Sequence, residues 1–436
     1  MPVTVARPRA LRGEIIAPGD KSVSHRAIML NALSHTGTAR ITNFSPGADC
    51  TSTVEIFRAL GVDIAREPGR DGMGDSLTVR GVGLNGLQEP ADVLDAGNSG
   101  TTTRLMSGIL AGRNIVTILT GDDSLKSRPM GRVVDPLRKM GAEITGRAGG
   151  TLAPLVFYGG SLKGTSYQMP VASAQLKSCL LLAGLRADGV TSITQPAESR
   201  DHTERMFSAM GAKLAKNGLE LTLEPSDLET VDIEIPGDIS SAAFWMIAGI
   251  CHPNAELFVR NVGINPTRAG IITLLQQMGA DLTLVDQREV AGEPVADVLA
   301  KSSQLKGVEL SGDIVPLLID EIPVIAVAAA LADGTTTIRD AAELRVKESD
   351  RISASVSWMK GAGIDVTATG DGMVVIGGGS IGGGQFQSYD DHRLAMSLGV
   401  AGLVSDEPIT ILDPDVAGIS YPGFWETVER FGGLVG

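Results

Sequence analysis

Cations and acids alternate in one short stretch of the chain, which reads Arg-Val-Lys-Glu-Ser-Asp-Arg from Arg345 to Arg351. On a helix, Lys347 and Arg351 would share one face, and Glu348 would also neighbour Arg351. Among the residues that could carry chemistry, this is the densest cluster of charge in the chain. An exposed helix with ion pairs on its surface would have the same composition, so a chemical role and a purely structural role both stay open at this point.

A second cluster lies near the start of the chain. Ser22 and Arg26 are four residues apart and would share a helix face, with Lys21 in the loop above it. A capped helix carrying two solvated bases is the alternative. A phosphate-binding P-loop is a poor match, because Asp20 separates Gly19 from the lysine and no later strand offers an evident magnesium-binding aspartate.

Other polar groups stand at the starts of predicted apolar helices. Helix N-termini favour anions, because their free N–H groups and the helix dipole both attract negative charge. Asp320 precedes such a helix and is either a simple cap or a general base beside buried surface. We expect several positive helix ends to converge on one face. The remaining candidates are Asn98 and Gly100, Arg128 in the loop 126–130, Ser173 to Gln175, Arg200, and the run from Asp390 to Arg393.

The composition limits the class of ligand. The 436 residues include 37 basic and 51 acidic ones, for a formal net charge of −14. This balance argues against a nucleic-acid-binding surface, which needs a broad basic face, but a local basic cluster can still bind a small anion. No set of His, Cys and Glu residues has the spacing of metal ligands.

Cysteine usage and hydropathy predict where the protein resides. Cys50, Cys179 and Cys251 lie far apart, as expected in a reducing compartment. The N-terminus lacks an apolar signal core, and the longest apolar run, 322–332, is too short to span a bilayer. We therefore expect a cytoplasmic protein without a membrane segment.

One pattern recurs six times along the chain. Each copy opens with a strand-like run after a turn and closes, 22 to 29 residues later, with an apolar residue, a glycine and a new short run. Such self-similarity predicts a repeated unit of strand, loop, helix and strand, in which the glycine ends the helix. The closing glycines are Gly61, Gly141, Gly211, Gly279, Gly363 and Gly432.

Six further helices, rich in small apolar residues, are predicted between these units. They are apolar nearly all round, so we expect them to be buried. Their predicted ranges are 24–33, 100–110, 173–185, 240–250, 323–331 and 394–403.

The middle of the chain carries the turn Pro236-Gly237-Asp238, which falls between the third and fourth repeats. We place the domain boundary there. The predicted domains are residues 20–237, and residues 1–19 together with 238–436. The first residues are strand-like and are expected to pair with the second half.

Taken together, these stretches resemble the enolpyruvyl transferase family over essentially the whole chain. The most specific resemblances are Gly-Asp-Lys-Ser-Val-Ser-His-Arg ending at Arg26, the stretch ending at Arg351, and Asp-Asp-His-Arg ending at Arg393. Asp20 and His25 resemble the class II branch, as does Ser173-Ala174-Gln175. The resemblance implies a two-domain, inside-out α/β barrel. It would have three βαβαββ units in each domain and an active site in the interdomain cleft.

The resemblance also implies a reaction. Within the family, the best match is the branch that transfers the enolpyruvyl group of phosphoenolpyruvate to the 5-hydroxyl of shikimate 3-phosphate. The reaction releases phosphate and passes through a tetrahedral ketal. It implies no cofactor and no metal, only small-molecule partners, and a monomeric protein.

Residue roles follow from the resemblance alone. Asp320 would accept the proton of the 5-hydroxyl, and Glu348, helped by Lys21, would protonate the methylene carbon. Two phosphates and a carboxylate require many cations, and arginine binds such groups with two N–H donors. The shikimate 3-phosphate set would be Lys21, Ser22, Arg26, Ser173, Ala174, Gln175, Arg200, Asp320, Glu343 and Lys347. The phosphoenolpyruvate set would be Lys21, Asn98, Gly100, Arg128, Gln175, Lys347, Glu348, Arg351, His392 and Arg393.

Ile419 departs from the family's sequence pattern, and Gly100 bears on inhibition. Many relatives have a lysine before an aromatic-proline pair near the C-terminus, where this chain has Ile419 before Ser420-Tyr421-Pro422. One cationic contact to phosphoenolpyruvate is therefore missing, which leaves more of that task to Arg128 and Arg393. Gly100 matches the inhibitor-sensitive pattern of the family, so glyphosate is expected to enter the site.

Two rival interpretations remain at this stage. The sister enzyme acting on UDP-N-acetylglucosamine shares the six-unit fold, but it usually uses a loop cysteine as acid. No cysteine lies in the loop 126–130, and Ser22 stands where that enzyme tends to have asparagine. The other rival is a non-catalytic repeat protein that binds anionic metabolites, which would bind ligand without turnover.

Overall fold

The computed structural model describes residues 1–35, 37–69 and 74–435. The chain divides into two compact units, each with its own hydrophobic core. The N unit comprises residues 19–235 and 289–293, and the C unit comprises residues 1–18, 236–288 and 294–436. Each is described by itself.

Each unit contains three sheets of four strands with one shared topology. The first pair of strands in each sheet is parallel, and the third strand is antiparallel to the second. In the N unit the sheets have the orders β14 (Ile233–Glu234), β3 (Thr38–Phe44), β5 (Asp75–Arg80), β4 (Ile64–Glu67); β6 (Leu94–Asp95), β7 (Thr117–Thr120), β9 (Leu152–Phe157), β8 (Ile144–Gly146); and β10 (Ser166–Gln168), β11 (Thr191–Thr194), β13 (Glu220–Leu223), β12 (Leu214–Asn217).

The three sheets of the C unit include the first two strands of the chain. Strand β1 (Val3–Val5) lies between two C-terminal strands, and β2 (Leu11–Ile16) pairs in parallel with β15 (Ala255–Gly263). The orders are β2, β15, β17 (Glu293–Lys301), β16 (Asp281–Val290); β18 (Glu309–Leu310), β19 (Thr335–Ile338), β21 (Met373–Ile376), β20 (Asp365–Ala368); and β22 (Gly384–Phe386), β23 (Ile409–Ile411), β1, β24 (Leu434–Val435).

The units differ from the predicted domains by one or two residues at each boundary, since residue 19 groups with the N unit and residues 236–237 with the C unit, and in one further short segment. Residues 289–293 comprise the end of β16, the turn after it and the first residue of β17, and they group with the N unit rather than with the rest of 238–436. The physical reason is a buried contact in the N unit, because the Glu293 carboxylate lies 2.8 Å from His202 Nδ1 and both side chains are 3% exposed. Sequence spacing gave no sign of this contact between residues 91 positions apart.

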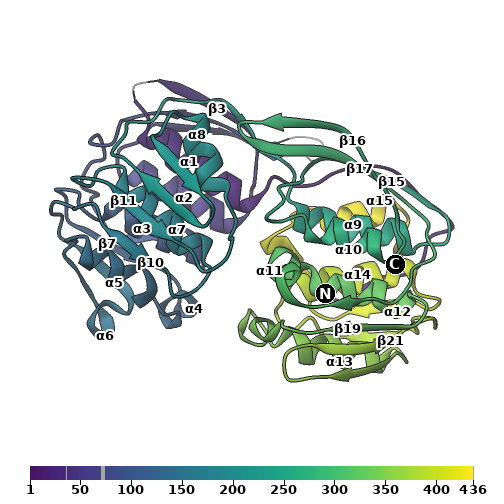
Figure 1. The fold of residues 1–436 in the computed structure, drawn as a ribbon. Helices are drawn as coiled ribbons and strands as arrows, with labels where there is room; N and C mark the ends of the chain where they lie inside the picture. The colour runs from purple at the N-terminus through teal and green to yellow at the C-terminus, as the bar shows by residue number, and fades with distance from the viewer. Residues whose placement is uncertain (36, 70–73, 436) are drawn as a thin grey trace. The chain divides into compact units, whose positions relative to one another are not determined.

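Six buried helices form the interior of the two units, as their all-round apolar sequences predict. In the C unit, α9, α12 and α14 contact one another, and Figure 1 shows them gathered among its strands. In the N unit, α3 contacts both α1 and α7. The six helices are α1 (Lys21–Leu33), α3 (Gly100–Leu110), α7 (Ala174–Gly184), α9 (Ile239–Cys251), α12 (Ile322–Leu331) and α14 (His392–Val404).

The other helices are mostly amphipathic or short. Those of the repeated units are α2 (Ala48–Ala59), α5 (Gly131–Lys139), α8 (His202–Ala209), α10 (Gly270–Gln277), α13 (Arg351–Gly361) and α15 (Phe424–Arg430). The short ones are α4 (Asp123–Ser127), α6 (Arg147–Gly150), α11 (Val315–Leu318), and the 3₁₀ segments η1 (Gly312–Ile314), η2 (Ile319–Glu321), η3 (Ala342–Val346) and η4 (Pro414–Ile419).

The glycine that closes each repeat has a specific conformational role. All six closing glycines follow a helix and have φ between +74° and +103°, in the left-handed region that L side chains rarely adopt. A glycine there lets the chain leave the helix and enter the next strand without a Cβ clash. The sixfold pattern in the sequence therefore marks six helix ends.

The apolar stretch before β19 is longer than the sequence predicted. Helical structure runs from Gly312 to Leu331, a segment of 20 residues that is long and apolar enough to cross a membrane. The prediction that the run is too short was wrong because it counted only residues 322–332 and not the preceding helical turns. In the C unit 72% of the apolar window is buried, as in the core helix of a folded domain.

Candidate active site

Lys21 is the first residue of α1, because the Asp20 side chain caps the helix by accepting a hydrogen bond from Val23 N at 2.9 Å. The helix thus starts three residues before the predicted start, and Lys21 is not in a loop above it. The Lys21 Nζ lies 3.2 Å from Asp49 Oδ2, on α2. Burial would raise the pKa of Asp49, but Lys21 outweighs it, and the pKa lies below its ordinary value.

Arg26 is buried one turn further along α1 and is bonded to the protein on three sides. Its Nε donates to Thr203 Oγ1 at 2.7 Å, Nη2 to Ser178 Oγ at 2.9 Å, and Nη1 to the Ser22 carbonyl at 2.9 Å. Burial lowers the pKa of Arg26 to about 10. A guanidinium has five N–H donors, so two remain for a ligand.

The start of α3 brings together three of the predicted residues. Asn98 Oδ1 accepts a 2.5 Å hydrogen bond from Arg128 Nη2, and the Asn98 carbonyl accepts from Arg128 Nη1 at 3.3 Å. Between Asn98 and Gly100, the Ser99 side chain caps α3 by accepting from Thr102 N. The cap therefore fixes the backbone that holds Arg128 in place.

Arg104 belongs to the same cluster but was not among the predicted site residues. Its Nη1 donates to Gln175 Oε1 at 2.7 Å, and Gln175 Nε2 donates to Thr101 Oγ1 at 3.1 Å. A Cβ added to Gly100 would meet Arg104 Nη1 at 2.9 Å and Arg128 Nη1 at 3.5 Å. Burial, and then nearby arginines, lower the pKa of Arg104 to about 10. A charged residue inside the apolar helix 100–110 was the signal that could have found it.

The start of α7 and the loop before α8 hold the other predicted residues of the N unit. Ser173 caps α7 by accepting from Leu176 N at 3.3 Å, and Ala174 is the first residue of the helix. Lys177 is fully buried, 2.6 Å from Glu204, and its Nζ donates to the Ser199 carbonyl at 3.1 Å. This bond fixes the residue before Arg200.

In the C unit, the Arg345–Arg351 stretch is not one continuous helix. Segment η3 ends at Val346, and α13 begins only at Arg351, with the Asp350 side chain as its cap. The prediction that Lys347 and Arg351 share a helix face is therefore wrong. Asp350 favours a cap over a helix interior, because its carboxylate can bond the free N–H of Ser353, here at 3.1 Å.

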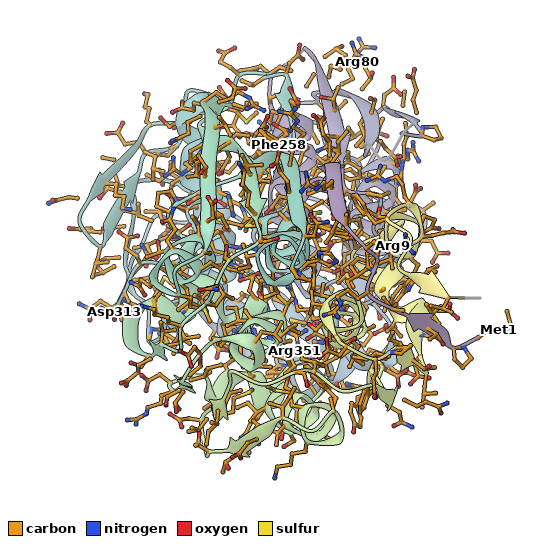
Figure 2. All side chains as sticks on the ribbon, turned by 90° about the vertical axis from the view of Figure 1, so that its right-hand side faces the viewer. Met1, Arg9, Arg80, Phe258, Asp313 and Arg351 are labelled. Atoms are coloured by element: carbon orange, nitrogen blue, oxygen red, sulfur yellow. The ribbon has the colours of Figure 1, made fainter. Side chains whose placement is uncertain are left out.

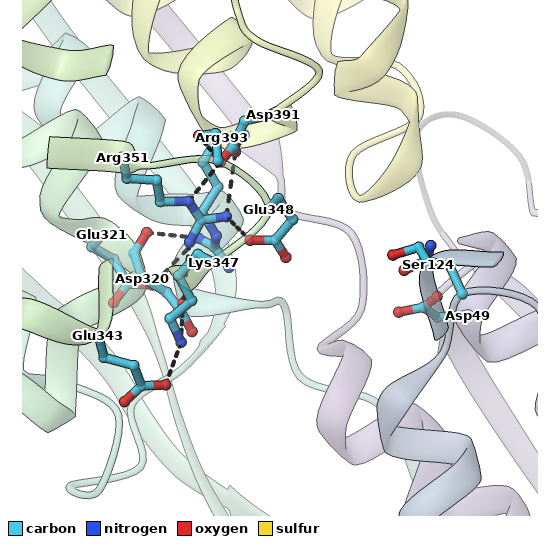
Figure 3. A network of polar contacts seen from close by, with 12 residues as sticks. Asp49, Ser124, Asp320, Glu321, Glu343, Lys347, Glu348, Arg351, Asp391 and Arg393 are labelled. Atoms are coloured by element: carbon cyan, nitrogen blue, oxygen red, sulfur yellow. Dashed lines mark hydrogen bonds and ion pairs between the residues drawn. The ribbon is translucent and has the colours of Figure 1, made fainter. Parts of the chain in front are cut away.

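Arg351, which Figure 2 labels, is 1% exposed. It is the centre of a cluster of carboxylates (Figure 3). Its Nε donates to Asp391 Oδ2 at 2.8 Å and its Nη2 to Glu348 Oε2 at 2.6 Å. Its Nη1 lies 3.5 Å from Asp320 Oδ1. Burial would raise the pKa of both Glu348 and Asp391, but Arg351 outweighs it and both pKa values lie below their ordinary values.

Two more cations surround Asp320. Lys347 Nζ lies 3.7 Å from Asp320 Oδ1 and 2.9 Å from Glu343 Oε1. Arg393 Nη1 donates to the Asp320 carbonyl at 3.1 Å (Figure 3). Lys347 and Arg351 thus meet at one carboxylate although they do not share a helix face.

Behind Arg393 lies Glu321, at 3.7 Å, which also accepts a hydrogen bond from Ser240. Burial raises the pKa of Glu321, and the cations Arg268 and Arg393 oppose that shift. The neighbouring His392 is the first residue of α14 and is 7% exposed.

The site residues form one cluster in each unit, and the two clusters have complementary chemistry. The cluster of the N unit includes Lys21, Arg26, Arg104 and Arg128, and that of the C unit includes Asp320, Lys347, Glu348, Arg351 and Arg393. Cations and helix N-termini in the N unit suit phosphate groups. The C unit adds carboxylates that can accept or donate a proton beside arginines that can hold a carboxylate. Among residues 1–35, 37–69 and 74–435, no group of three or more His, Cys, Asp or Glu residues could hold a metal ion. Ile419, which replaces the expected lysine, is 53% exposed at the end of η4.

Comparison with known proteins assigns the family. A model of EPSP synthase, or 3-phosphoshikimate 1-carboxyvinyltransferase, matches residues 5–428. Curated relatives with that second name are 51% identical in Pelobacter propionicus, over 98% of both chains, and 53% identical in a Synechococcus species, over 98% of this chain and 96% of the relative.

Solved structures confirm the predicted fold. EPSP synthase from Acinetobacter baumannii superimposes with a TM-score of 0.92 at 44% identity, over 100% of this chain and 99% of that one. The enolpyruvyl transferase NikO from Streptomyces tendae, at 18% identity and a TM-score of 0.77 over 99% and 97% of the two chains, shares the fold. With a family model matched over nearly its whole length and relatives above 50% identity, this chain belongs to the EPSP synthase family.

Proposed function

We propose that the residues of the two clusters carry out carboxyvinyl transfer with the division of roles described below. The chain is a 3-phosphoshikimate 1-carboxyvinyltransferase of the shikimate pathway, which leads to chorismate and the aromatic amino acids. It transfers the enolpyruvyl group of phosphoenolpyruvate to the 5-hydroxyl of shikimate 3-phosphate and releases phosphate. The observation that carries the residue roles is the placement of Asp320 and Glu348 on one buried arginine, Arg351.

The N unit supplies the main contacts to shikimate 3-phosphate in this proposal. Lys21 and the two remaining N–H donors of Arg26 neutralise its phosphate, and Ser22 and Ser173 bond its oxygens. Gln175 and Arg200 complete the set. Glu343 and Lys347 of the C unit bond the remaining polar groups. The burial of Arg26 supports its role, because a desolvated guanidinium interacts strongly with a phosphate.

The addition step needs a base and an acid. Asp320 removes the proton of the 5-hydroxyl as that oxygen bonds to C2 of phosphoenolpyruvate, and Glu348, helped by Lys21, gives a proton to C3. The product is a tetrahedral ketal with a methyl group. In the elimination step one methyl proton returns to the protein, the C2–C3 double bond re-forms and the C2–O bond to phosphate breaks.

The ion pairs around Arg351 explain how the acid acquires its proton. In the unliganded protein Arg351 keeps the pKa of Glu348 low, so this carboxyl is ionised at neutral pH. When the carboxylate of phosphoenolpyruvate binds Arg351 and Arg393, it takes over N–H donors that Glu348 now uses. Weaker pairing raises the pKa of Glu348 and lets it carry a proton.

Phosphate release tests this function against its rivals. With phosphoenolpyruvate and shikimate 3-phosphate, the purified protein is expected to release phosphate, whereas UDP-N-acetylglucosamine in place of shikimate 3-phosphate gives none. Release with the nucleotide sugar would favour the sister enzyme. Release with neither acceptor, together with binding of shikimate 3-phosphate, would indicate a non-catalytic binding protein.

Glyphosate is proposed as an inhibitor that competes with phosphoenolpyruvate. Gly100→Ala is expected to weaken it, because the new Cβ would lie 2.9 Å from Arg104 Nη1, which is buried and bonded to Gln175. A displacement of this arginine that weakens inhibitor binding by about 1.4 kcal/mol would raise the inhibition constant about tenfold. Gly418→Ala, at a glycine whose added Cβ would meet nothing within 4 Å, is the control. Millimolar glyphosate without effect on the wild type would contradict the proposal.

The protein is further proposed to be a cytoplasmic monomer. The support for the compartment is that Cys50, Cys179 and Cys251 are all free thiols, as expected in a reducing environment. Light scattering of the purified protein and fractionation of cells check the two statements.

A further inference from the structure

A chain of buried polar side chains connects three helices of the N unit. His25 Nδ1 lies 2.7 Å from Thr53 Oγ1, Thr53 Oγ1 lies 2.8 Å from Thr102 Oγ1, and Thr102 Oγ1 lies 2.7 Å from Ser99 Oγ. All four residues have zero exposure. We call them the hydroxyl chain. It runs from α1 through α2 to the cap of α3.

The hydroxyl chain has a direction. Thr102 donates its single hydroxyl proton to Ser99 Oγ at 2.7 Å, the shortest of its three candidate contacts, since Thr53 Oγ1 lies at 2.8 Å and the Asp49 carbonyl at 3.4 Å. Thr102 therefore accepts from Thr53, and Thr53 accepts from an Nδ1–H of His25. Burial lowers the pKa of His25 to about 3, so the ring is neutral and carries one N–H.

The hydroxyl chain lies one helical turn inside the polar groups of the candidate site. His25 is four residues after Lys21, and Thr53 is four residues after Asp49, the partner of Lys21 at 3.2 Å. At the other end, Ser99 lies between Asn98, which accepts two hydrogen bonds from Arg128, and Gly100. A shift of Ser99 would therefore displace Arg128.

Burying these polar groups is not needed for packing alone. Valine has nearly the shape of threonine and avoids the cost of desolvating a hydroxyl. A chain of buried hydrogen bonds, however, fixes its members in one arrangement in a way that apolar contacts do not. The hydrogen bonds of the hydroxyl chain thus point to a requirement for precise placement of Ser99, the residue at its end.

We propose that the hydroxyl chain is a positioning device that sets the cap of α3, and through Asn98 and Arg128 the affinity for phosphoenolpyruvate. His25, Thr53 and Thr102 act through Ser99 and do not touch the substrate. This inference rests on the proposed function, because Arg128 serves phosphoenolpyruvate there. It gives a role in that reaction to His25, Thr53 and Thr102, to which the family resemblance assigns none.

Thr102→Val tests the proposal with a closely matched control. The variant keeps the side-chain shape and breaks the hydroxyl chain. Thr103→Val removes the hydroxyl of the next residue, which is equally buried and donates to the backbone carbonyl of Ser99 at 2.9 Å but is not a member of the hydroxyl chain. We expect Thr102→Val to raise the KM for phosphoenolpyruvate by about 3- to 10-fold. The KM for shikimate 3-phosphate stays within about twofold, and Thr103→Val changes neither.

Two further variants separate positioning from folding. Thr53→Val breaks the hydroxyl chain on α2 and is expected to give the same split between the two KM values. Thr102→Ser restores the hydroxyl and is expected to return the KM for phosphoenolpyruvate to within about twofold of wild type. Thermal unfolding of all variants shows how far stability accounts for any change.

Specific outcomes would overturn the proposal. Equal effects of Thr102→Val and Thr103→Val, an equal rise of both KM values, or no recovery with Thr102→Ser would each do so. Failure of both Thr102→Val and Thr53→Val to fold, while Thr103→Val folds, would assign the hydroxyl chain to stability alone. A wild type without turnover would instead contradict the proposed function, so the two failures are distinguishable.

Discussion

Asp320→Asn is expected to lower kcat by about 10²- to 10⁴-fold with little change in folding. The amide keeps the size of the side chain but cannot accept the proton of the 5-hydroxyl. The two cations paired with the Asp320 carboxylate keep other partners, since Lys347 is 2.9 Å from Glu343 and Arg351 is bonded to Asp391. Steady-state kinetics of phosphate release, with thermal unfolding alongside, measure the effect.

Asp313→Asn is the control for this substitution. Asp313 belongs to the same unit and lies seven positions earlier on exposed η1, where Figure 2 labels it. Its conversion to asparagine is expected to leave kcat within about twofold, as for a surface substitution away from special features. An Asp320→Asn variant with more than about a tenth of wild-type kcat would assign the base to another group.

Arg351→Gln is expected to reduce the stability of the C unit by about 3–5 kcal/mol, the usual cost of leaving one member of a buried ion pair without its partner. Asp391 would lose the guanidinium that bonds both of its oxygens while it stays fully buried. Denaturant unfolding at neutral pH measures the loss. Arg7→Gln, in the same unit, is the control, because the side chains of its pair with Asp406 are 35% and 53% exposed and such a pair is worth only about 0.2–1 kcal/mol.

The stability difference is expected to depend on pH in a specific direction. The folded-state pKa of Asp391 lies below its ordinary value of 3.8, so its pairing with Arg351 stabilises the fold above that pH. The contribution is lost as the pH falls through the folded-state pKa. The gap between wild type and Arg351→Gln should therefore shrink from pH 7 toward pH 3. A gap that stays constant would show that charge pairing at Asp391 is not its source.

The fold could be predicted largely because it is repeated. The six closing glycines stood out by spacing alone, and each ends a helix in the structure. The six apolar helices were found because their composition differs from that of amphipathic ones. The contact between Glu293 and His202 could not be found, because it joins side chains 91 residues apart that no local pattern connects.

The candidate site was predicted less completely, for a related reason. Motifs identified Lys21, Arg128, Asp320 and Arg351, and the structure places them at helix ends in the two clusters. Motifs could not show which acceptor each N–H group of an arginine bonds. Arg104 was missed, since its role depends on Gln175, and Asp49 was missed because only folding brings it to Lys21. The substrate contacts assigned to these residues stay predictions.

The break in the Arg345–Arg351 stretch shows where periodicity misleads. Four-residue spacing predicted a shared helix face for Lys347 and Arg351, but Asp350 caps α13 and the chain is extended at Lys347. A capping aspartate competes with helix continuation, because its carboxylate bonds backbone N–H groups of the following turn. The two cations still meet, through Asp320 rather than through the helix.

Turnover in D₂O tests the central claim, that Glu348 and Asp320 drive addition to and elimination from one carbon. Protonation at C3 makes a methyl group whose hydrogens become nearly equivalent before one leaves. With the wild type, the account predicts deuterium in the vinyl methylene group of the product, seen by NMR or mass spectrometry. Phosphoenolpyruvate left unreacted by Asp320→Asn is predicted to carry no deuterium. Product formed with no deuterium at that carbon would show that C3 is never protonated and would contradict the mechanism.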